Sequence, residues 1–369
     1  MRYDSIRPGK IWLDTSGKPI QAHGFSVFWN EKEKLWYWYG ENKERTDGKG
    51  NIWHWGVRLY TGRDLMNWDD RGLIIPPQPK DLTSPLHPTY CMDRPHILYC
   101  EKTGLYVAWL KVMAGEVSQF MSVLTSPHFE GPYTFVHRII KPLDMDTGDF
   151  CLHADEDGKA YIWFERPHFQ LICADLTEDY TDVTGNYSVH YDGFLPPLTR
   201  EAPTYFERKG KRYLFTSGTS GYYPNPSKVC MFEDPHGEYT DLGDPFIGDR
   251  SHTSFSSQIT SVIKLPGTDR YIACADRWMP QWYVKPLAGQ IISGMERHFK
   301  DYQPDTTPRK AAPLPGTQSS GIRRTHPFPA TYGCPWNGRE ISLSSGGERA
   351  GGRRSSRNNE KQSGFRNES

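Results

Sequence analysis

An all-β fold is predicted for this chain of 369 residues from two observations. The first is composition: 36% of the residues are hydrophobic, 14% are aromatic, and the chain contains 34 Gly and 29 Pro. Aromatic residues favour strands, while Gly and Pro mark turns, so this composition is typical of a turn-rich β protein. The second observation is a repeated hairpin, which also predicts how the strands are arranged.

The hairpin is clearest at residues 199–218. Glu201 opens a short apolar run, a charged turn that contains Gly210 follows, and an aromatic-rich run returns at Tyr213. This hairpin occurs five times along the chain, and such a repeat of short strands predicts a β-propeller, here with five blades. The five copies carry their anchoring aromatic residues at Trp36, Tyr106, Tyr161, Tyr213 and Tyr271, which are 70, 55, 52 and 58 residues apart.

Each copy begins with a polar residue, 12 or 13 positions before its aromatic anchor. If the first strand of each blade is the innermost, these residues crowd around one end of the central channel. Carboxylates that lie together there would have divergent pKa values, as acid and base chemistry requires. These head residues are His23, Asp93, Asp149, Glu201 and Gln258.

The predicted domain organisation is a propeller over residues 1–300 and a low-complexity, disordered tail over residues 301–369. Blade five is the irregular one. Strands are expected at 259–265 and 271–275, and 282–287 reads as a third, but no sequence beyond that resembles a fourth strand. The blade is therefore expected either to be closed by the N-terminal strand at 10–14 or to be left frayed.

Charge and motifs exclude several functions. From Asp305 onward there are 11 Lys and Arg against 5 Asp and Glu, which leaves the first 304 residues with 33 against 39. A mildly acidic body argues against nucleic acid and fits a neutral substrate better. The seven cysteines form no Cys-x-x-Cys pair, and neither a zinc site nor a disulfide framework is expected. No dinucleotide, P-loop or zincin motif is present, so no cofactor and no metal are expected.

The sequence contains no apolar run long enough for a signal peptide or a membrane span. The chain as written is therefore expected to be intracellular unless a leader is missing, and it is expected to be a monomer without a membrane partner.

Several short motifs together resemble glycoside hydrolase family 43, and in particular its exo-β-1,3-galactanase branch. The resemblance covers roughly residues 9 to 287, with motifs in every blade and in the same order as in the family. It implies a five-bladed propeller that hydrolyses an oligo- or polysaccharide with inversion at the anomeric carbon. The motifs are Ile-Gln-Ala-His-Gly (20–24), Trp-Tyr-Gly-Glu-Asn-Lys (38–43), Asp-Arg-Pro-His (93–96), Asp149 with Asp-Glu-Asp-Gly-Lys-Ala-Tyr (155–161), Arg-Glu-Ala-Pro (200–203), Ser-Gly-Thr-Ser-Gly-Tyr (217–222) with Pro-Asn (224–225), Phe-Ser-Ser-Gln (255–258) and Asp-Arg-Trp (276–278).

The same resemblance implies roles for individual residues. Glu201 takes the role of general acid, and Asp149 that of the aspartate that raises the pKa of the acid and orients it. A carboxylate beside another resists ionisation, which supports both assignments chemically. The substrate-binding positions that the family implies are Glu41, Asp93, Thr219 and Gly221.

The catalytic base is where the chain departs from most of the family. Ala22 and His23 stand where a first-blade aspartate is usual. The galactanase branch shares this absence, and there the glutamine of the fifth-blade motif positions the attacking water, which implies the same role for Gln258. A neutral amide is a poor base, so Asp93 or Glu41 could serve instead if either faces the water.

The leading hypothesis is an inverting, exo-acting β-galactosidase that acts on the β-1,3-galactan of plant-type arabinogalactan. An α-L-arabinofuranosidase or β-xylosidase of the same fold is the second, since loops rather than the scaffold select the sugar. A non-catalytic carbohydrate-binding propeller is the third. The plainer interpretations also stand: Glu201 and Asp149 as buried polar ties between blades, His23 as a satisfied core histidine, and residues 155–158 as a hairpin turn.

Overall fold

The computed structural model describes residues 2–46, 52–114, 118–221, 223–278 and 341–345. Across these residues the chain is built almost wholly from antiparallel strands, and the one helix is a short 3-10 turn at Pro142–Asp144. No helix among the described residues has the length and apolar character needed to cross a membrane.

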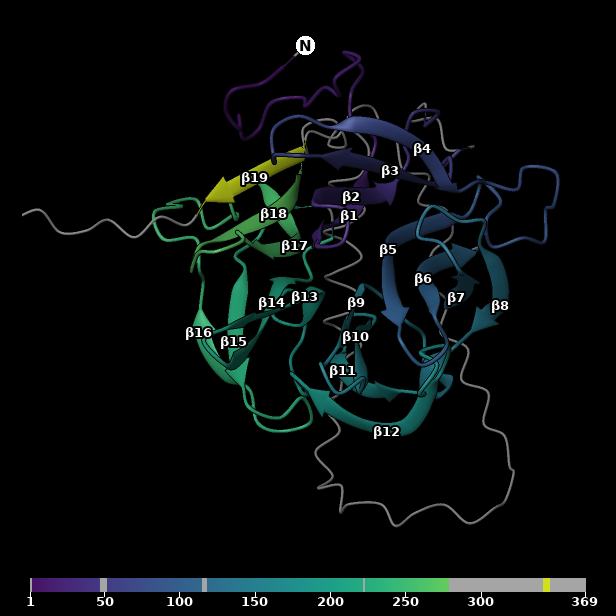
Figure 1. Cartoon of the computed structure of the whole chain (residues 1–369). Coiled ribbons are helices and arrows are strands. Elements are labelled where there is room, and N and C mark those ends of the chain that lie inside the picture. The colour runs from purple at the N-terminus through teal and green to yellow at the C-terminus, as the bar shows by residue number, and fades with distance from the viewer. Residues whose placement is uncertain (1, 47–51, 115–117, 222, 279–340, 346–369) are drawn as a thin grey trace, which may run out of the picture.

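The strands form consecutive antiparallel sheets arranged around a common centre (Figure 1), so the all-β propeller class is confirmed. Four sheets have four strands each, which follow one another in chain order from the inside outward. They comprise β1 (His23–Asn30), β2 (Leu35–Glu41), β3 (Val57–Gly62) and β4 (Asp69–Ile75); β5 (Cys91–Cys100), β6 (Leu105–Ala114), β7 (Ser118–Ser126) and β8 (Thr134–Ile140); β9 (Phe150–Ala154), β10 (Ala160–Arg166), β11 (Gln170–Leu176) and β12 (Val183–His190); and β13 (Arg200–Arg208), β14 (Lys211–Gly218), β15 (Lys228–Phe232) and β16 (Thr240–Gly243).

The fifth sheet has three described strands, β17 (Ser257–Lys264), β18 (Tyr271–Arg277) and β19 (Ile341–Ser345). The prediction of five blades, the fifth of them irregular, is thus confirmed in part: the described residues form four four-stranded blades and one sheet of three strands. The third strand comes from the tail that was expected to be disordered, and it pairs antiparallel with β18 from Ile272↔Ser345 to Asp276↔Ile341. The strand predicted at 282–287 and the remainder of the tail lie outside the described residues.

The N-terminal segment does not complete the fifth sheet, contrary to one of the two expectations for blade five. Leu13 forms an isolated bridge with Pro19, within the same segment. The ring of Trp12 packs in a T-shaped arrangement against Trp38, with ring centroids 5.4 Å apart. The segment therefore packs its side chains over the junction between the first blade and the fifth sheet and adds no strand to that sheet.

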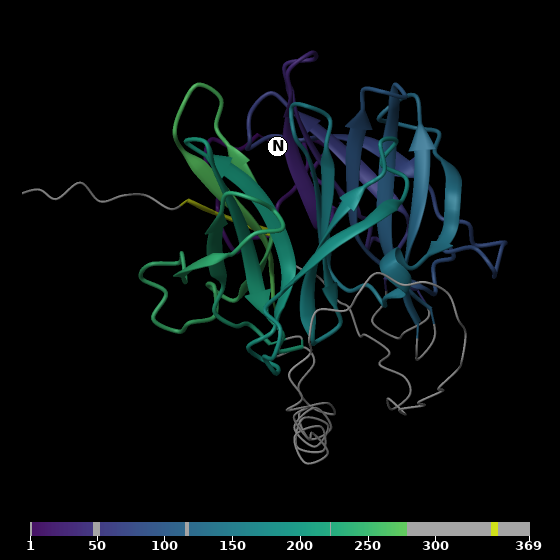
Figure 2. The same cartoon turned by 90° about the horizontal axis from the view of Figure 1, so that it is seen from below.

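The first strands of the five sheets are the innermost, which is the arrangement that brings the head residues together. β1 contacts β5, β5 contacts β9, β9 contacts β13, β13 contacts β17, and β17 contacts β1 again. In a view at right angles to that of Figure 1, the same sheets stand side by side with their strands running between the two ends of the channel (Figure 2). The inner strands thus close a ring, which places their starting residues near one another.

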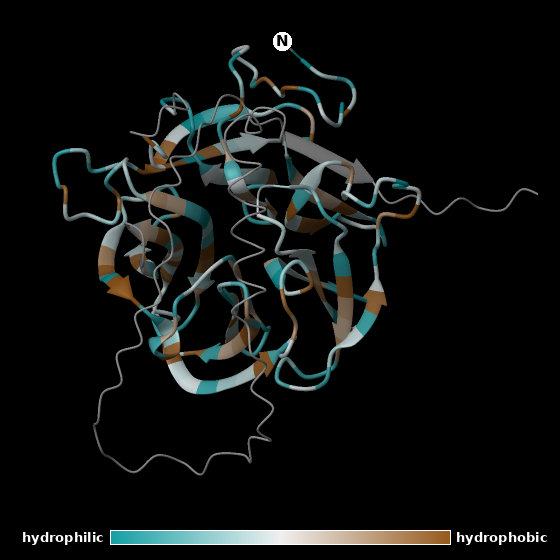
Figure 3. Cartoon of the chain, turned by 180° about the vertical axis from the view of Figure 1, so that it is seen from behind, coloured by the Kyte–Doolittle hydropathy of each residue, from teal (hydrophilic) through white to brown (hydrophobic). Residues whose placement is uncertain are grey.

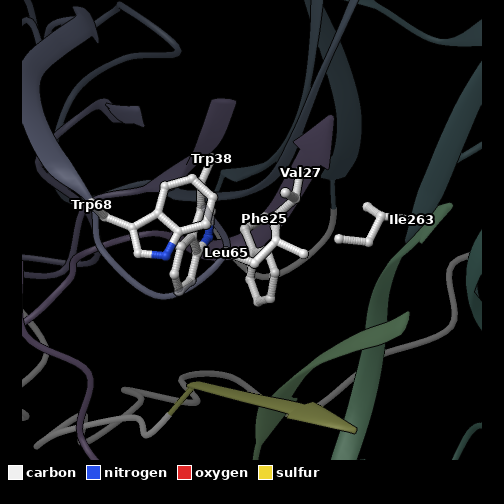
Figure 4. Close-up of a pocket in the computed structure, with 6 residues that line it drawn as sticks. All are labelled: Phe25, Val27, Trp38, Leu65, Trp68 and Ile263. Carbon is white, nitrogen blue, oxygen red and sulfur yellow. The ribbon is translucent and has the colours of Figure 1, made fainter. Parts of the chain in front are cut away.

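The hydrophobic core is divided into five clusters, one at each junction between neighbouring sheets. Seen from behind, apolar and polar stretches both occur along the strands (Figure 3). A strand that packs on both faces is buried at consecutive positions, as β10 is from Ala160 to Glu165. At the junction of the first blade and the fifth sheet, a small apolar pocket is lined by Phe25, Val27, Trp38, Leu65, Trp68 and Ile263 (Figure 4). This pocket has no polar lining and belongs to the core.

The inner strands carry β-bulges next to their head residues. The register shifts between His23 and Ser26 in β1, Asp93 and His96 in β5, Glu201 and Thr204 in β13, and Ile259 and Ser261 in β17. In the first three strands the residue after the head has a positive φ: 55° at Gly24, 46° at Arg94 and 51° at Ala202. A bulge interrupts the alternation of side chains, so two consecutive residues can both face the channel.

Candidate active site

A buried network of charged and polar side chains lies at the end of the channel where the inner strands begin. Asp149 lies at its centre, one residue before β9, and is only 8% exposed. The Nε of Arg94 lies 3.0 Å from Asp149 Oδ2, and the Nζ of Lys111 lies 3.0 Å from Oδ1. Burial alone would raise the pKa of Asp149, but Arg94 and Lys111 lower it below its usual value. Asp149 is therefore a carboxylate at neutral pH.

Gln258 connects this charge cluster to Glu201. Arg94 Nη2 donates to Gln258 Oε1 at 2.7 Å, and Gln258 Nε2 donates to Glu201 Oε1 at 2.9 Å and to Ser217 Oγ at 3.0 Å. Because a guanidinium has only donors, Arg94 fixes the orientation of the amide so that its NH₂ group faces Glu201. Gln258 thus holds the carboxyl group of Glu201 directly.

Glu201 differs from Asp149 in its protonation. Burial raises the pKa of Glu201 well above the ordinary value of 4.5, and the negative charges of Glu165 and Asp149 raise it further. Since Oε1 accepts the Gln258 N–H, we assign the acidic proton to Oε2. Two carboxyl groups at one end of the channel, one ionised and one neutral, form the pattern expected of a site for acid chemistry.

Glu41 and His23 form a second cluster in the same region. Both are buried, and His23 Nδ1 pairs with Glu41 Oε1, while His23 Nε2 lies 2.8 Å from Asp276 Oδ2 and Lys43 Nζ lies 2.8 Å from Glu41 Oε2. Although burial raises it, Lys43 and His23 lower the pKa of Glu41 to about 2. His23 is accordingly a satisfied histidine, as the plainer interpretation predicted, and it ties β1 to β18.

Asp93 is the more accessible carboxylate of this region, with a side chain that is 14% exposed. The indole Nε1 of Trp53 donates to its Oδ1 at 3.3 Å, and Lys111 Nζ lies 3.7 Å from Oδ2. Asp93, His23 and Glu41 bring possible metal ligands within 4.8 Å of one another. The ammonium of Lys43 already neutralises Glu41, which leaves little reason for a cation to bind there.

Thr219 and Gly221 follow β14 on the loop that also approaches Asn225. The backbone N–H of Thr219 donates to Pro197 O at 3.2 Å, and its hydroxyl bonds that of Thr199. Gly221 is exposed and has a φ of 64°. Among the described contacts, these two residues lie beside the charged network without joining it, whereas Glu201, Asp149 and Gln258 are linked within it.

Several members of the network were not singled out from the sequence. Arg94 follows Asp93 within a motif that was noted, and its inward orientation depends on the bulge in β5. Lys111 and Asp276 lie on second strands, β6 and β18, opposite the heads of β5 and β17 in register. A search extended to the residues that pair with the head residues would have found them, as well as Ser217, which pairs with Glu201.

No disulfide joins the six cysteines that lie in the described part of the chain. The turn at residues 155–158 is a hairpin turn, as predicted, and the Gly158 N–H donates to Asp155 O.

Comparison with known proteins agrees with this geometry. The sequence profile of the family described as Glycosyl hydrolases family 43 matches residues 29–277. No curated protein sequence matches the chain.

Among solved structures, a family 43 β-1,3-galactosidase bound to galactodeoxynojirimycin is 26% identical, with a TM-score of 0.66, over 74% of this chain and 91% of that one. Exo-β-1,3-galactanases from Phanerochaete chrysosporium, solved with β-1,3-galactotriose, and from Clostridium thermocellum are 25% and 27% identical, with TM-scores of 0.63 and 0.62. Each match covers 75% of this chain, and 61% and 59% of those two chains respectively. The match of the profile to residues 29–277 of 369 covers well over half of the chain, so the protein belongs to glycosyl hydrolase family 43.

Proposed function

We propose that this glycoside hydrolase is an inverting, exo-acting β-galactosidase that removes galactose from β-1,3-galactan. The observation that carries the proposal is the pairing of a neutral, buried Glu201 with an ionised Asp149 at one end of the channel. The solved relatives that are galactosidases and galactanases on β-1,3 linkages support the choice of sugar.

In this proposal Glu201 is the general acid. Its Oε2 donates a proton to the leaving glycosidic oxygen while Oε1 stays bound to Gln258 Nε2. Asp149 acts on Glu201 through its charge, because a nearby carboxylate disfavours a second one. Arg94 and Lys111 keep Asp149 ionised and fixed in place, so that this charge is constant throughout the reaction.

Gln258 is assigned the role of positioning the attacking water, and Asp93 is the alternative, as a base that would activate this water. Both N–H groups of Gln258 are used by the protein, and the remaining acceptor position on Oε1 is the one that could hold a water. Glu41 is the weaker candidate, because it is fully buried and already paired with His23 and Lys43. Asp93 is partly exposed and therefore better placed than Glu41 to meet a water.

Substrate contacts are proposed for Glu41, Asp93, Thr219 and Gly221, around the same end of the channel. We also count the three-stranded sheet of β17, β18 and β19 as the fifth blade, because its first strand completes the inner ring. The arabinofuranosidase or xylosidase alternative uses the same acid, and only the sugar pocket would differ.

The test is to incubate the purified protein separately with β-1,3-galactan, arabinoxylan and nitrophenyl glycosides, and to identify the sugar released. Galactose from the galactan is the expected product. Arabinose or xylose would move the substrate to the alternative. Sugar binding without any release, identical in the wild type and in Glu201→Gln, would show a binding propeller rather than an enzyme.

A further inference from the structure

Glu165 and His168 lie beside the network, and neither has a step assigned to it in the proposed hydrolysis. Glu165 is in β10, and its side chain is 4% exposed, whereas that of His168, in the turn after β10, is 50% exposed. The backbone N–H of His168 donates to Glu165 Oε1 at 2.8 Å, and its ring Nδ1 lies 3.0 Å from the same oxygen. The two side chains therefore form one unit, buried at the carboxylate and open to solvent at the imidazole.

The unit is built against the backbone that carries Asp149. Gly148 N donates to Glu165 O at 2.7 Å, and Glu165 N donates to Asp149 O at 2.8 Å. A Cβ at position 148 would lie 2.2 Å from Glu165 Oε2, so only glycine lets the carboxylate occupy this place. As a result, ligand-type atoms of Glu165, His168 and Glu201 all lie within 4.8 Å of one another.

We propose that Glu165 and His168 are a positioning pair that controls the protonation of Glu201, Glu165 favouring its acid form and His168 favouring its carboxylate. This rests on the proposed role of Glu201 as the general acid. Glu165 keeps the proton on Glu201 until the leaving group takes it. The imidazolium of His168 then lowers the cost of two adjacent carboxylates, until solvent returns a proton to Glu201.

The electrostatics agree with opposite roles. Burial is the first cause of the raised pKa of Glu201, the charge of Glu165 is the second and that of Asp149 the third, while the charge of His168 lowers this pKa. Although burial lowers it, Glu165 raises the pKa of His168 to about 9, so His168 is cationic at neutral pH. The charged groups that act on Glu201 from all sides are Glu165, Asp149, His168, Lys111, Arg94 and Arg200.

The test uses Glu165→Gln and His168→Asn and follows the alkaline limb of the kcat/KM profile, where Glu201 loses its proton. Loss of the negative charge should move this limb to lower pH, and loss of the positive charge should move it to higher pH. His153→Asn is the matched control, because His153 lies at the far end of β9 and pairs with Asp155 and Glu207. It should leave the limb in place.

A second readout separates acid control from structural damage. A dinitrophenyl β-galactoside has a leaving group that needs no proton. At pH values above the shifted alkaline limb, the kcat/KM of Glu165→Gln should therefore fall roughly tenfold or more on galactan but less than about twofold on the aryl glycoside. Shifts of both variants in the same direction, no shift in either, or equal losses on both substrates would overturn the proposal.

Failure of the proposed function is a distinct result. If the wild type releases no galactose from either substrate, the protonation of Glu201 can be followed by NMR titration of glutamate-labelled protein, with Glu201→Gln identifying the signal. The opposite shifts of the Glu201 signal in Glu165→Gln and His168→Asn would still support the pair, and their absence would reject it.

Discussion

The fold favours the protonated form of Glu201 and tolerates its ionised form poorly. The carboxyl is buried, accepts one hydrogen bond from Gln258, and is surrounded by the charges of Glu165 and Asp149. Its pKa in the folded protein is raised above the ordinary 4.5. Its contribution to stability is therefore complete below about pH 4.5 and is lost as the pH rises through the folded-state pKa.

Glu201→Gln should accordingly be inactive but more stable at neutral pH. The amide keeps the shape and can still accept the Gln258 N–H, but it never ionises. We expect a loss of roughly 10²- to 10⁴-fold in kcat on galactan, as for removal of a general acid. Thermal unfolding at pH 5 and pH 8 should show the larger gain in Tm at pH 8. A Tm below that of the wild type at both pH values would contradict the raised pKa.

Gln258→Ala tests whether this residue positions water or only holds the acid. Water must attack whatever the leaving group is, so a water-positioning role predicts a comparable loss, on the order of 10²-fold, on galactan and on a dinitrophenyl β-galactoside. If the variant kept near wild-type rates on the dinitrophenyl substrate, Gln258 would only orient Glu201. The same comparison with Asp93→Asn examines the alternative base.

Among the elements, the bulged inner strands determine which side chains reach the site. Gly24 in β1 has a φ of 55°, and a Cβ there would lie 2.9 Å from the backbone N of Arg94. The bulge of β1 therefore packs on the bulge of β5, where Arg94 binds both Asp149 and Gln258. Close backbone contact between neighbouring blades keeps the Arg94 guanidinium in register with its partners.

Gly24→Ala should destabilise the protein and also reduce its activity. Gly17→Ala is the matched control, because Gly17 has a φ of 86° and nothing within 4 Å of the Cβ position. The control should cost roughly 1 kcal/mol from backbone strain alone, and Gly24→Ala about 2 kcal/mol or more because Arg94 must also move. Urea unfolding and kcat/KM measure both effects. Equal losses in the two variants would mean that the contact with Arg94 is unimportant.

The same elements explain how far sequence reasoning reached. The period of aromatic anchors predicted the ring of sheets, and the head residues Asp149, Glu201 and Gln258 do converge in one network. Arg94 was not identified, because period-two alternation places it on the opposite side of the strand from Asp93, and only the bulge brings both inward. Glu165 was not identified because it lies on a second strand, β10, where its backbone binds that of the head residue Asp149, and His168 was not identified because it lies in the turn after β10.

The fifth sheet shows a different limit. Its third strand, β19, begins 64 residues after β18 ends, since β18 ends at Arg277 and β19 begins at Ile341. Five residues in a segment rich in Ser, Gly and Arg carry little local signal for a strand. The pairing with β18 depends on a long-range contact, which composition cannot reveal.

At the scale of the whole molecule, the ring is closed between the first blade and the fifth sheet. An aromatic cluster around Trp38 and Trp68 fills this junction, and the His23 side chain bridges Glu41 and Asp276 at the channel end. The same charges therefore serve both the site and the closure of the propeller.

Glu41→Gln should weaken the fold at neutral pH and flatten its acid sensitivity. The folded pKa of Glu41 is lowered to about 2 from an ordinary 4.5, so its stabilising effect is present above about pH 4.5 and disappears as the pH falls toward 2. Breaking a buried pair should cost about 3 kcal/mol at pH 7.

The control for this prediction is Asp81→Asn. Its pKa is also lowered to about 2, but the side chain is 43% exposed in a surface pair with Arg138. Asp81→Asn should have little effect on the free energy of unfolding measured with urea, both at pH 7 and at acidic pH. A Glu41→Gln variant as stable as Asp81→Asn at pH 7 would show that the charge cluster does not hold the ring closed.

The most direct test of the central claim is the anomeric configuration of the first product. Proton NMR during the early turnover of β-1,3-galactan by the wild type, with Glu201→Gln alongside, distinguishes new α-galactose from β-galactose before mutarotation. An inverting site predicts α-galactose from the wild type and none from the variant. Initial release of β-galactose, or undiminished release by Glu201→Gln, would contradict an inverting hydrolase that uses Glu201 as its acid.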